Sequence, residues 1–208
     1  MRQVAPRNPE AGFADEPPFL GYELRRPLQE EAGDNRGMTR VLLVPGRGVA
    51  KPDHWSRRWA REHGYRWAPE PPGPPYVPDA RVADLRRVLG ESDEPAVLVA
   101  HSAGCVTVAL WADRERTGVD NVSPVVGALL VTPPYVEEVP RRRLPFRSVL
   151  VASRNDPHAV FGEQERFARE WGAGLVDAGS VGHLDSATGF GPWPQGEELL
   201  DRLLSSLR

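Results

Sequence analysis

Short runs of apolar residues alternate along the chain with longer stretches in which apolar residues recur every three or four positions. The short runs are almost continuously Val, Leu and Ala, which is typical of parallel strands buried on both faces. They predict strands at 40–44, 96–100, 125–131, 148–151 and 175–176. The helical periodicity predicts helices at 53–63, 79–89, 103–116, 162–171 and 195–207. This alternation predicts an α/β fold in which a mostly parallel sheet carries helices on both faces.

Two proline-rich stretches stand apart from this alternation. Residues 1–37 have mixed charge and few large apolar side chains, so they bury too little surface to offset the entropy lost on ordering. We expect a flexible N-terminal extension at 1–37 and one α/β domain at 38–208. The alternative is an arm that docks through the apolar residues at 19–22. The stretch 69–78 is expected to be an irregular connection, because proline lacks the backbone donor.

Composition and charge exclude several classes of protein. The 208 residues include 26 Lys and Arg and 29 Asp and Glu, which gives a formal net charge of −3, and the basic residues are scattered. We therefore expect no nucleic acid and no membrane as a partner. No apolar run resembles a membrane span or a secretory signal, which predicts a cytoplasmic protein. The single cysteine, Cys105, excludes zinc sites built on cysteine pairs and is expected to be buried. Nothing in the sequence implies a metal or an organic cofactor.

The strand expected at 96–100 runs directly into His101-Ser102-Ala103-Gly104, and a helical pattern follows at once. A strand, a sharp turn and a helix form the layout of a nucleophile elbow, which presents its central residue at the C-terminal edge of the sheet. The residues two positions before and after the nucleophile must be small, and here they are Ala100 and Gly104. Ser102 is therefore the candidate nucleophile.

A nucleophilic serine needs a base, and the base needs an acid that orients it, in the chain order Ser, Asp, His for this layout. Asp156 follows the strand expected at 148–151, and His183 follows the strand expected at 175–176. Each candidate follows a parallel strand, so we expect all three at one edge of the sheet. Asp185 is a rival acid, but a carboxylate two residues from His183 is poorly placed to orient it. The sequence predicts a catalytic triad of Ser102, His183 and Asp156.

An oxyanion hole needs backbone amides directed at the negative charge that develops on the substrate. One candidate is the amide of Ala103, at the N-terminus of the helix after Ser102. The other is the amide of Arg47, in the glycine-containing loop at 44–48, where glycine lets the backbone approach a substrate. A phosphate-binding role for this loop is disfavoured, because the Gly-Lys-Ser/Thr ending and the dinucleotide-binding glycine spacing are both missing.

Several residues near these motifs are candidates for the substrate pocket. Phe190 and Trp193 closely follow the candidate base and are candidates for an apolar acyl pocket, with core packing as the alternative. Trp55 lies close to the oxyanion loop, but its spacing of four residues from Trp59 favours core packing. His158 is a candidate because it is two residues from the candidate acid, with a solvated loop position as the alternative.

A neighbouring histidine and a basic run each have a structural and a functional interpretation. His101 directly precedes the candidate nucleophile, and we expect its side chain to point away from it and to be structural. The run Arg141-Arg142-Arg143 is a candidate docking surface for an acidic partner such as an acyl carrier protein. Most such runs are solvated surfaces, and that interpretation is favoured here.

These motifs together resemble the small serine hydrolase family of retinoblastoma-binding protein nine and the bacterial YdeN-like proteins. The matching stretches are Val-Pro-Gly-Arg-Gly at 44–48, His54-Trp55 with Trp59, Ala-His-Ser-Ala-Gly-Cys at 100–105, Ser-Arg-Asn-Asp-Pro at 153–157, Gly-His at 182–183 and Gly-Phe-Gly-Pro-Trp-Pro at 189–194. The resemblance implies a compact α/β-hydrolase core without a large lid domain. It also implies that Ser102 is the nucleophile, Asp156 the acid and His183 the base.

The sequence departs from this family at three places. Ala103 stands where many members carry a leucine or another residue, and the stretch 67–78 replaces an acidic and aromatic segment. The Leu-x-Cys-x-Glu motif for retinoblastoma binding is absent, because Ala103 lies two positions before the single cysteine. We therefore expect no pocket-protein partner.

The sequence predicts an enzyme that forms an acyl-Ser102 intermediate from an ester, thioester or amide and passes the acyl group to water. One alternative is an acyltransferase of the same mechanism, which moves an aryl acyl group from a carrier-protein thioester to a second nucleophile. The other alternative is a non-catalytic binding module, because a fold by itself does not establish a function. The expected partner is a small acyl substrate, and an acyl carrier protein is the second candidate.

Overall fold

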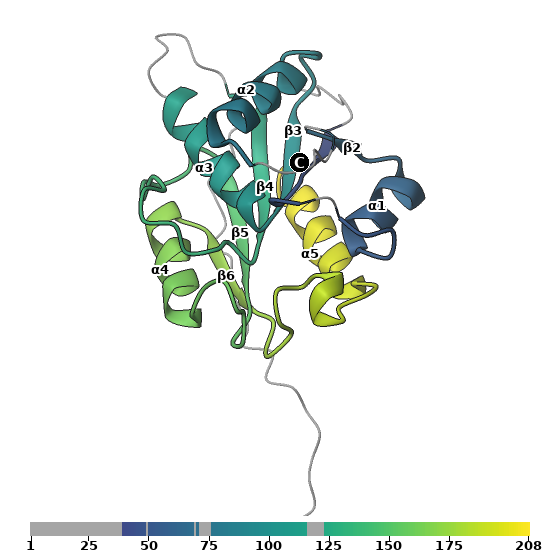
Figure 1. Ribbon diagram of the computed structural model, residues 1–208. Coiled ribbons are helices and arrows are strands. Elements are labelled where there is room, and N and C mark those ends of the chain that lie inside the picture. The colour runs from purple at the N-terminus through teal and green to yellow at the C-terminus, as the bar shows by residue number, and fades with distance from the viewer. Residues whose placement is uncertain (1–38, 49, 69, 71–75, 116–122) are drawn as a thin grey trace, which may run out of the picture. The chain divides into compact units, whose positions relative to one another are not determined.

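The computed structural model describes residues 39–48, 50–68, 70, 76–115 and 123–208 (Figure 1). The expected extension at 1–37 and most of the stretch 69–78 lie outside the described residues. Within them, strands β1 to β6 form one sheet in the order β2-β1-β3-β4-β5-β6, and every neighbouring pair is parallel. The strands are β1 (Arg40–Val44), β2 (Arg66–Trp67), β3 (Ala96–His101), β4 (Val125–Val131), β5 (Arg147–Ala152) and β6 (Gly174–Asp177).

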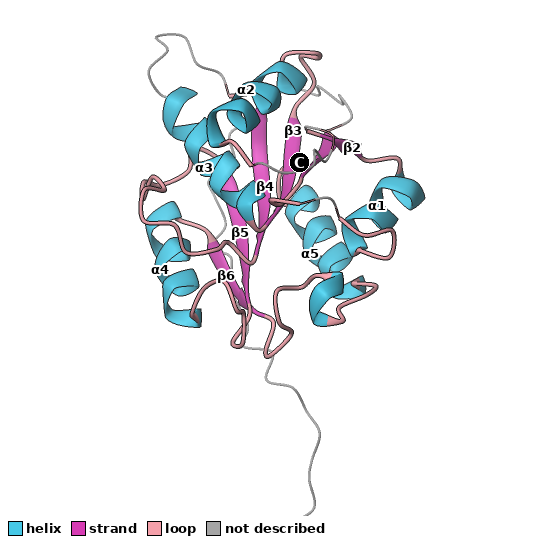
Figure 2. Cartoon of the chain, in the orientation of Figure 1, coloured by secondary structure: helices cyan, strands magenta, loops and turns pink. Residues whose placement is uncertain are grey.

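Helices cover both faces of this sheet (Figures 1 and 2). One face carries α2, α3 and α4, and the other carries α1 and α5. Their bounds are α1 (Trp55–His63), α2 (Pro78–Leu89), α3 (Ala103–Glu115), α4 (Phe161–Trp171) and α5 (Pro194–Ser205), with a short 3-10 helix, η1 (Ser186–Thr188). The predicted α/β fold with a parallel sheet between two helical layers is confirmed.

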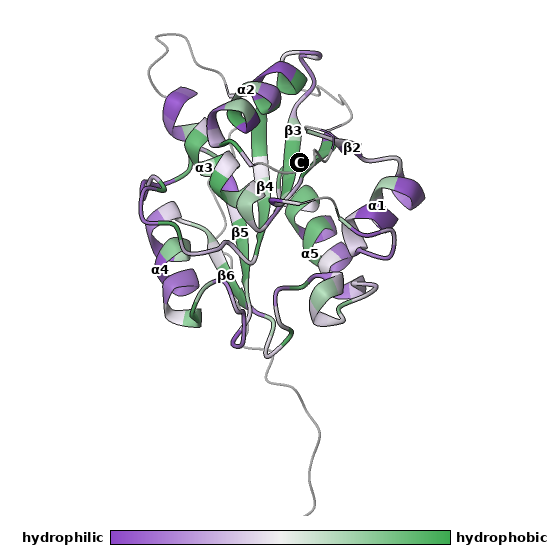
Figure 3. Ribbon diagram, viewed as in Figure 1, coloured by the Kyte–Doolittle hydropathy of each residue, from purple (hydrophilic) through white to green (hydrophobic). Residues whose placement is uncertain are grey.

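Two apolar cores lie on the two faces of the sheet. Strand residues alternate between them, so that Leu42 and Leu98 pack with α2, α3 and α4, whereas Leu43 and Val99 pack with α1 and α5. All four of these side chains are fully or almost fully buried. This burial on both faces explains the nearly continuous apolar sequence of the strands, which Figure 3 shows as hydrophobic ribbon.

The structure corrects some predicted boundaries. Strand β2 was not predicted, because a two-residue edge strand is too short to show a pattern. Pro78 was expected in an irregular connection but lies in the first turn of α2, where a proline sacrifices no hydrogen bond. Helix α1 begins at Trp55, two residues later than predicted, because the His54 side chain caps it and accepts a hydrogen bond from the Ser56 amide.

The strand register places the chemistry at one edge of the sheet. The last residues of β3 and β4, His101 and Val131, are paired, and Val131 is paired in turn with Val151 of β5. The loops that follow β3, β4, β5 and β6 therefore leave the sheet side by side, as ligand-binding loops do in open parallel sheets. None of the described helices is both long enough and apolar enough to span a membrane.

Candidate functional site

Ser102 lies in a sharp turn between β3 and α3. Its φ angle is +56°, in the left-handed region that residues other than glycine rarely adopt. The turn is held by two backbone hydrogen bonds, from the Ser102 amide to the Val131 carbonyl and from the Cys105 amide to the Ser102 carbonyl, each 2.9 Å long. The structure thus contains the strand, turn and helix expected of a nucleophile elbow.

The loop after β1 packs directly against this turn. A Cβ atom on Gly104 would clash with the carbonyl oxygen of Val44 and would lie 2.9 Å from that of Pro45. A Cβ atom on Gly46 would lie 3.2 Å from the Cβ of Ser102. Both glycines are therefore needed for a close approach between this loop and Ser102. On the far side of the elbow Cys105 is fully buried, as predicted.

The structure brings the side chains of Ser102, His183 and Asp156 into one hydrogen-bonded chain. His183 Nε2 lies 2.8 Å from Ser102 Oγ, and His183 Nδ1 lies 2.9 Å from Asp156 Oδ1 and 3.1 Å from Oδ2. The histidine and aspartate side chains are almost completely buried. The rival acid, Asp185, instead caps η1 by accepting a hydrogen bond of 2.9 Å from the Thr188 amide. The geometry required of a nucleophile, base and acid is present.

The carboxylate of Asp156 is held by two further hydrogen bonds. Its Oδ1 accepts from the His158 amide at 2.9 Å, and its Oδ2 accepts from Gln164 Nε2 at 2.7 Å. The other end of the Gln164 amide accepts from the Ser153 amide at 2.9 Å, so this fully buried glutamine ties α4 to the loop that carries the acid. Gln164 was missed in the sequence, although a polar residue on the apolar face of a helix was the available signal.

The backbone of His183 is held by two side chains, one from the last residue of β3 and one from the residue that follows β4. Its carbonyl accepts hydrogen bonds from His101 Nε2 at 2.9 Å and from Thr132 Oγ1 at 3.2 Å. Because a carbonyl can only accept, Nε2 of His101 carries the ring proton. Thr132 was not predicted, and it takes part from a left-handed turn at the end of β4, with φ at +45°.

The structural role expected of His101 is confirmed by its hydrogen bond to the His183 carbonyl, and its ring also lies beside the ring of His183. Strand alternation directs its ring to the α1 face of the sheet, and the loop with His183 lies on the same face. The centroid of the His101 ring is 5.0 Å from that of His183 and 5.0 Å from that of His54. Burial lowers the pKa of His101 to about 3 and that of His54 to about 4, so both rings are neutral at physiological pH.

A cavity of about 580 Å³ opens at Ser102. Arg47, Ala103 and His183, which were expected at the site, line this cavity. Trp55 and His158, which were candidates for the pocket with a structural or solvated role as the alternative, line it as well. The His158 ring is exposed and meets the ring of His183 edge to face, with centroids 4.3 Å apart. The cavity also has aromatic walls that were not predicted, formed by Trp67, Tyr76 and Tyr135.

Phe190 and Trp193 do not line this cavity, and their expected role as its acyl pocket is corrected. Trp193 is 5% exposed and packs against Trp55 and Trp59, at centroid distances of 5.1 and 5.7 Å. Phe190 contacts Trp193 at 6.4 Å. The physical reason is that Trp193 caps the start of α5 and joins the core between α5 and α1. Trp55 is fully buried in the same core, and its indole donates a hydrogen bond of 2.8 Å to the Leu184 carbonyl.

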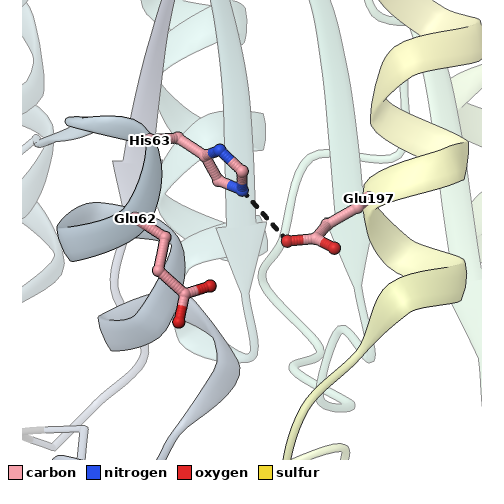
Figure 4. A group of neighbouring side chains, drawn as sticks. All are labelled: Glu62, His63 and Glu197. Atoms are coloured by element: carbon pink, nitrogen blue, oxygen red, sulfur yellow. Dashed lines mark hydrogen bonds and ion pairs between the residues drawn. The ribbon is translucent and has the colours of Figure 1, made fainter.

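A group of possible metal ligands lies on the surface between α1 and α5 (Figure 4). The ligand atoms of Glu62, His63 and Glu197 are within 4.8 Å of one another. His63 Nε2 pairs with Glu197 at 3.0 Å, and Glu62 pairs with Arg58 at 3.1 Å. These ion pairs account for the arrangement without a metal. None of the three ligands lines the cavity at Ser102.

The basic run at 141–143 has partners within the chain. Arg141 lies 3.5 Å from Glu170, and Arg142 lies 3.9 Å from Asp113. Surface pairs of this kind contribute little to stability. Docking of an acidic partner on this run stays a prediction.

The model of the serine hydrolase family matches residues 41–202 of the chain, a range that contains Ser102, Asp156 and His183. Among solved structures, a YdeN-like hydrolase of Pectobacterium atrosepticum is similar, with 26% identity, 81% of this chain and 92% of that chain covered and a TM-score of 0.73. The ydeN gene product of Bacillus subtilis has 19% identity, 80% and 99% coverage and a TM-score of 0.61.

More distant likeness extends across α/β hydrolases. A monoacylglycerol lipase of Paleococcus ferrophilus has 13% identity, with 81% of this chain and 95% of that chain covered and a TM-score of 0.57. This likeness shows the fold alone. A search of curated protein sequences finds no significant match.

Proposed function

Since this chain belongs to the serine hydrolase family and is a hydrolase, we propose that it cleaves an ester, thioester or amide through an acyl-Ser102 intermediate. The observation that carries the proposal is the hydrogen-bonded chain from Ser102 through His183 to Asp156, which begins at the cavity and ends in the buried interior. The cavity volume of about 580 Å³ suits a small substrate, because small-molecule pockets are typically about 300–1,000 Å³.

Acylation of Ser102 begins with proton transfer to His183. The Nδ1–H group of His183 donates a hydrogen bond to the carboxylate of Asp156 and keeps its proton, so Nε2 is free to accept the proton of Ser102 Oγ, 2.8 Å away. The oxygen then attacks the substrate carbonyl and forms a tetrahedral intermediate. When this collapses, the bond to the leaving group breaks, and the leaving group takes the proton from His183 Nε2. Water then attacks the carbonyl of acyl-Ser102 while His183 takes a proton from it. The second tetrahedral intermediate collapses, the carboxylic acid product is released, and Ser102 Oγ takes the proton back from His183.

Two backbone amides are proposed to stabilise the oxyanion. The amide of Ala103 begins α3, where the first N–H groups have no acceptor within the helix and carry the positive end of the helix dipole. The amide of Arg47 belongs to the loop in which an added Cβ on Gly46 would lie 3.2 Å from the Cβ of Ser102, and Arg47 lines the cavity. Removing one oxyanion donor typically lowers kcat by about 10² to 10³.

The proposal is tested with a fluorophosphonate probe and the intact mass of the protein. Wild-type protein should gain the mass of one adduct, because an activated serine displaces fluoride from the probe, and Ser102→Ala should gain none. Ser186→Ala is the matched control, since Ser186 also lines the cavity but bonds Asp53 at 2.9 Å and should leave labelling unchanged. A folded wild-type protein that takes up no adduct would favour the binding-module alternative.

Hydrolysis and acyl transfer differ in the step that removes the acyl group. After a single exposure to p-nitrophenyl butyrate, we expect acyl-Ser102 to disappear in water at a rate that added thiols, amines and alcohols change little. An acyl-enzyme that persists in water and discharges only with an acceptor would instead establish the acyltransferase.

A further inference from the structure

A buried arginine lies behind the loop that supplies the proposed Arg47 amide. Arg81, in the first half of α2, is 3% exposed. It forms no ion pair with any carboxylate in the described part of the chain. A buried charge without a charged partner costs stability, so its presence calls for an explanation in terms of what it contacts.

The guanidinium contacts two groups of the site. Arg81 Nη2 donates a hydrogen bond of 3.0 Å to the Gly46 carbonyl, and the guanidinium carbon lies over the Tyr76 ring, 5.2 Å from its centroid. The second terminal nitrogen, Nη1, is buried without a hydrogen-bond partner among the described residues. Among the described residues, the Gly46 carbonyl is thus the hydrogen-bond acceptor that the buried guanidinium of Arg81 contacts.

Planarity links this hydrogen bond to the proposed oxyanion donor. The carbonyl of Gly46 and the N–H of Arg47 belong to one peptide group, and in a trans peptide they point in opposite directions. Fixing the carbonyl on Arg81 therefore fixes the direction of the Arg47 N–H. The peptide is close to the nucleophile, because a Cβ atom on Gly46 would lie 3.2 Å from the Cβ of Ser102.

Tyr76 extends the same contacts to the other side of the oxyanion hole. Its hydroxyl lies 3.2 Å from the Ala103 carbonyl, to which it donates, and 3.0 Å from Thr107 Oγ1. Ala103 begins the helix whose amide is the other proposed donor. Arg81 and the ring beneath it therefore touch both backbone segments that flank Ser102.

We propose that Arg81 is a positioning residue, which holds the Gly46–Arg47 peptide so that the Arg47 amide is ready to stabilise the oxyanion on acylation of Ser102. This inference rests on the proposed function. A hydrogen bond from a cation also polarises the peptide and strengthens its N–H as a donor, since linked hydrogen bonds reinforce one another. The buried charge still costs stability, and what it supplies in this proposal is an oxyanion donor that needs no reorganisation during the reaction.

The test compares Arg81→Met with wild type, because methionine keeps much of the apolar stem and removes the charge and the donors. We expect kcat for p-nitrophenyl butyrate to fall about 10- to 100-fold, with KM changed less than about 2-fold, because the lost interaction acts on the transition state. Tm should stay level or rise, since an unpaired buried charge is removed. Arg81→Lys should lie between the two, since lysine keeps the charge but cannot stack or reach in the same way.

Arg86→Met is the matched control on the same helix. Arg86 pairs on the surface with Glu115 at 2.6 Å, and its side chain is 56% exposed. This variant should keep the wild-type kcat and KM. The proposal is overturned if Arg81→Met keeps the wild-type kcat. It is also overturned if kcat falls only in proportion to the amount of folded protein.

The rate of fluorophosphonate labelling separates this proposal from the proposed function. Phosphonylation of Ser102 also places negative charge on an oxygen in the oxyanion hole, so Arg81→Met should be labelled about 10-fold more slowly or worse. Equal labelling of Arg81→Met and wild type would overturn the role of Arg81 alone. If the folded wild-type protein is neither labelled nor able to turn over the ester, both proposals are overturned.

Discussion

At the scale of single residues, the surroundings of Ser102 depend on Gly104, which has no room for a side chain, and on Gly46, where an added Cβ would be tightly packed. Gly104 meets backbone carbonyl oxygens of the loop after β1, and Gly46 meets Ser102 itself. Backbone oxygens at the end of a central strand cannot move aside cheaply, because the packed core on both sides holds them. One added carbon atom at Gly104 is therefore expected to push the end of β1 and its loop away from the turn that carries Ser102.

Gly104→Ala tests this packing. The added carbon clashes with the Val44 carbonyl, and we expect a loss of stability of about 1–3 kcal/mol together with a lower kcat. Thermal unfolding and turnover of an ester measure the two effects. Gly162→Ala is the matched control, because Gly162 is likewise the second residue of a helix and has nothing within 4 Å of an added Cβ.

The control should be neutral or stabilising by up to about 1 kcal/mol, since alanine favours a helix over glycine. Equal Tm values for Gly104→Ala and wild type would contradict the described contact.

The residues of the site differ in how well the sequence predicted them. Ser102, Asp156 and His183 are predictable because each lies in the turn or loop that follows a parallel strand, and their order along the chain is the one expected for a nucleophile elbow. Gln164 and Arg81 are not, because each reaches the site from a helix whose place beside the loops is set only by tertiary packing. A polar residue on a buried helical face is the pattern that both share.

At the scale of elements, the loops after β5 and β6 are joined by side-chain hydrogen bonds. Asn155 Oδ1 accepts from the Gly182 amide at 2.7 Å, and Ser153 Oγ accepts from the Val181 amide at 3.2 Å. These bonds connect the loop that carries Asp156, the proposed acid, to the loop that carries His183, the proposed base. The spacing between Asp156 and His183 is thus set by the two loops together.

Asn155→Ala should loosen this connection. The Gly182 amide loses its acceptor, and we expect faster hydrogen exchange at 178–184 and a kcat lowered several-fold, because the base samples more positions relative to the acid. Hydrogen exchange followed by mass spectrometry and steady-state kinetics give the two readouts. Arg154→Ala is the control on the same loop, since Arg154 forms a surface pair with Asp177 and should change neither. Unchanged exchange in Asn155→Ala would show that other contacts hold the loop.

Elements were predictable where they are long and buried. The central strands β1, β3, β4 and β5 have apolar residues on both faces, so their sequence pattern is strong. The two-residue strand β2 has one buried and one exposed position, which gives no pattern to read. Phe190 and Trp193 show a further limit, because an aromatic residue has the same sequence signature in a core as in a pocket.

At the scale of the whole molecule, two buried neutral histidines link folding to pH. The pKa of His101 is lowered from 6.5 to about 3 and that of His54 from 6.5 to about 4, in both cases chiefly by burial. An unfolded chain takes up a proton on each ring as the pH falls through 6.5, whereas the folded protein does not until about pH 4. The stability that they contribute is therefore present above pH 6.5 and is lost progressively as the pH falls toward the folded values.

Between pH 7 and pH 5, each histidine should lower the free energy of unfolding by up to about 2 kcal/mol, so we expect Tm at pH 5 to be lower by up to about 8–16 °C. His101→Gln should reduce this drop by about half, because glutamine can keep a donor near the His183 carbonyl but does not titrate. Thermal unfolding of both proteins from pH 7 to pH 5 measures this fall in Tm. The carboxylates with lowered pKa values are Glu91, Asp177 and Asp185, and they titrate below this window because their ordinary values are already 4.5 or 3.8. A Tm that changes equally with pH in both proteins would contradict the prediction.

The parallel order of the sheet also governs how the molecule comes to be active. Strand β1 pairs with β3 across the whole of α1, β2 and α2, and every other neighbouring pair in the sheet joins segments that are separated by a crossover. Such distant pairings form slowly, because the chain must close long loops before any contact compensates for them. Ser102, Asp156 and His183 follow three different strands, so no early fragment of the folding chain holds all three. On the proposed mechanism, we therefore expect catalysis to recover during refolding only when β3, β5 and β6 are all in place.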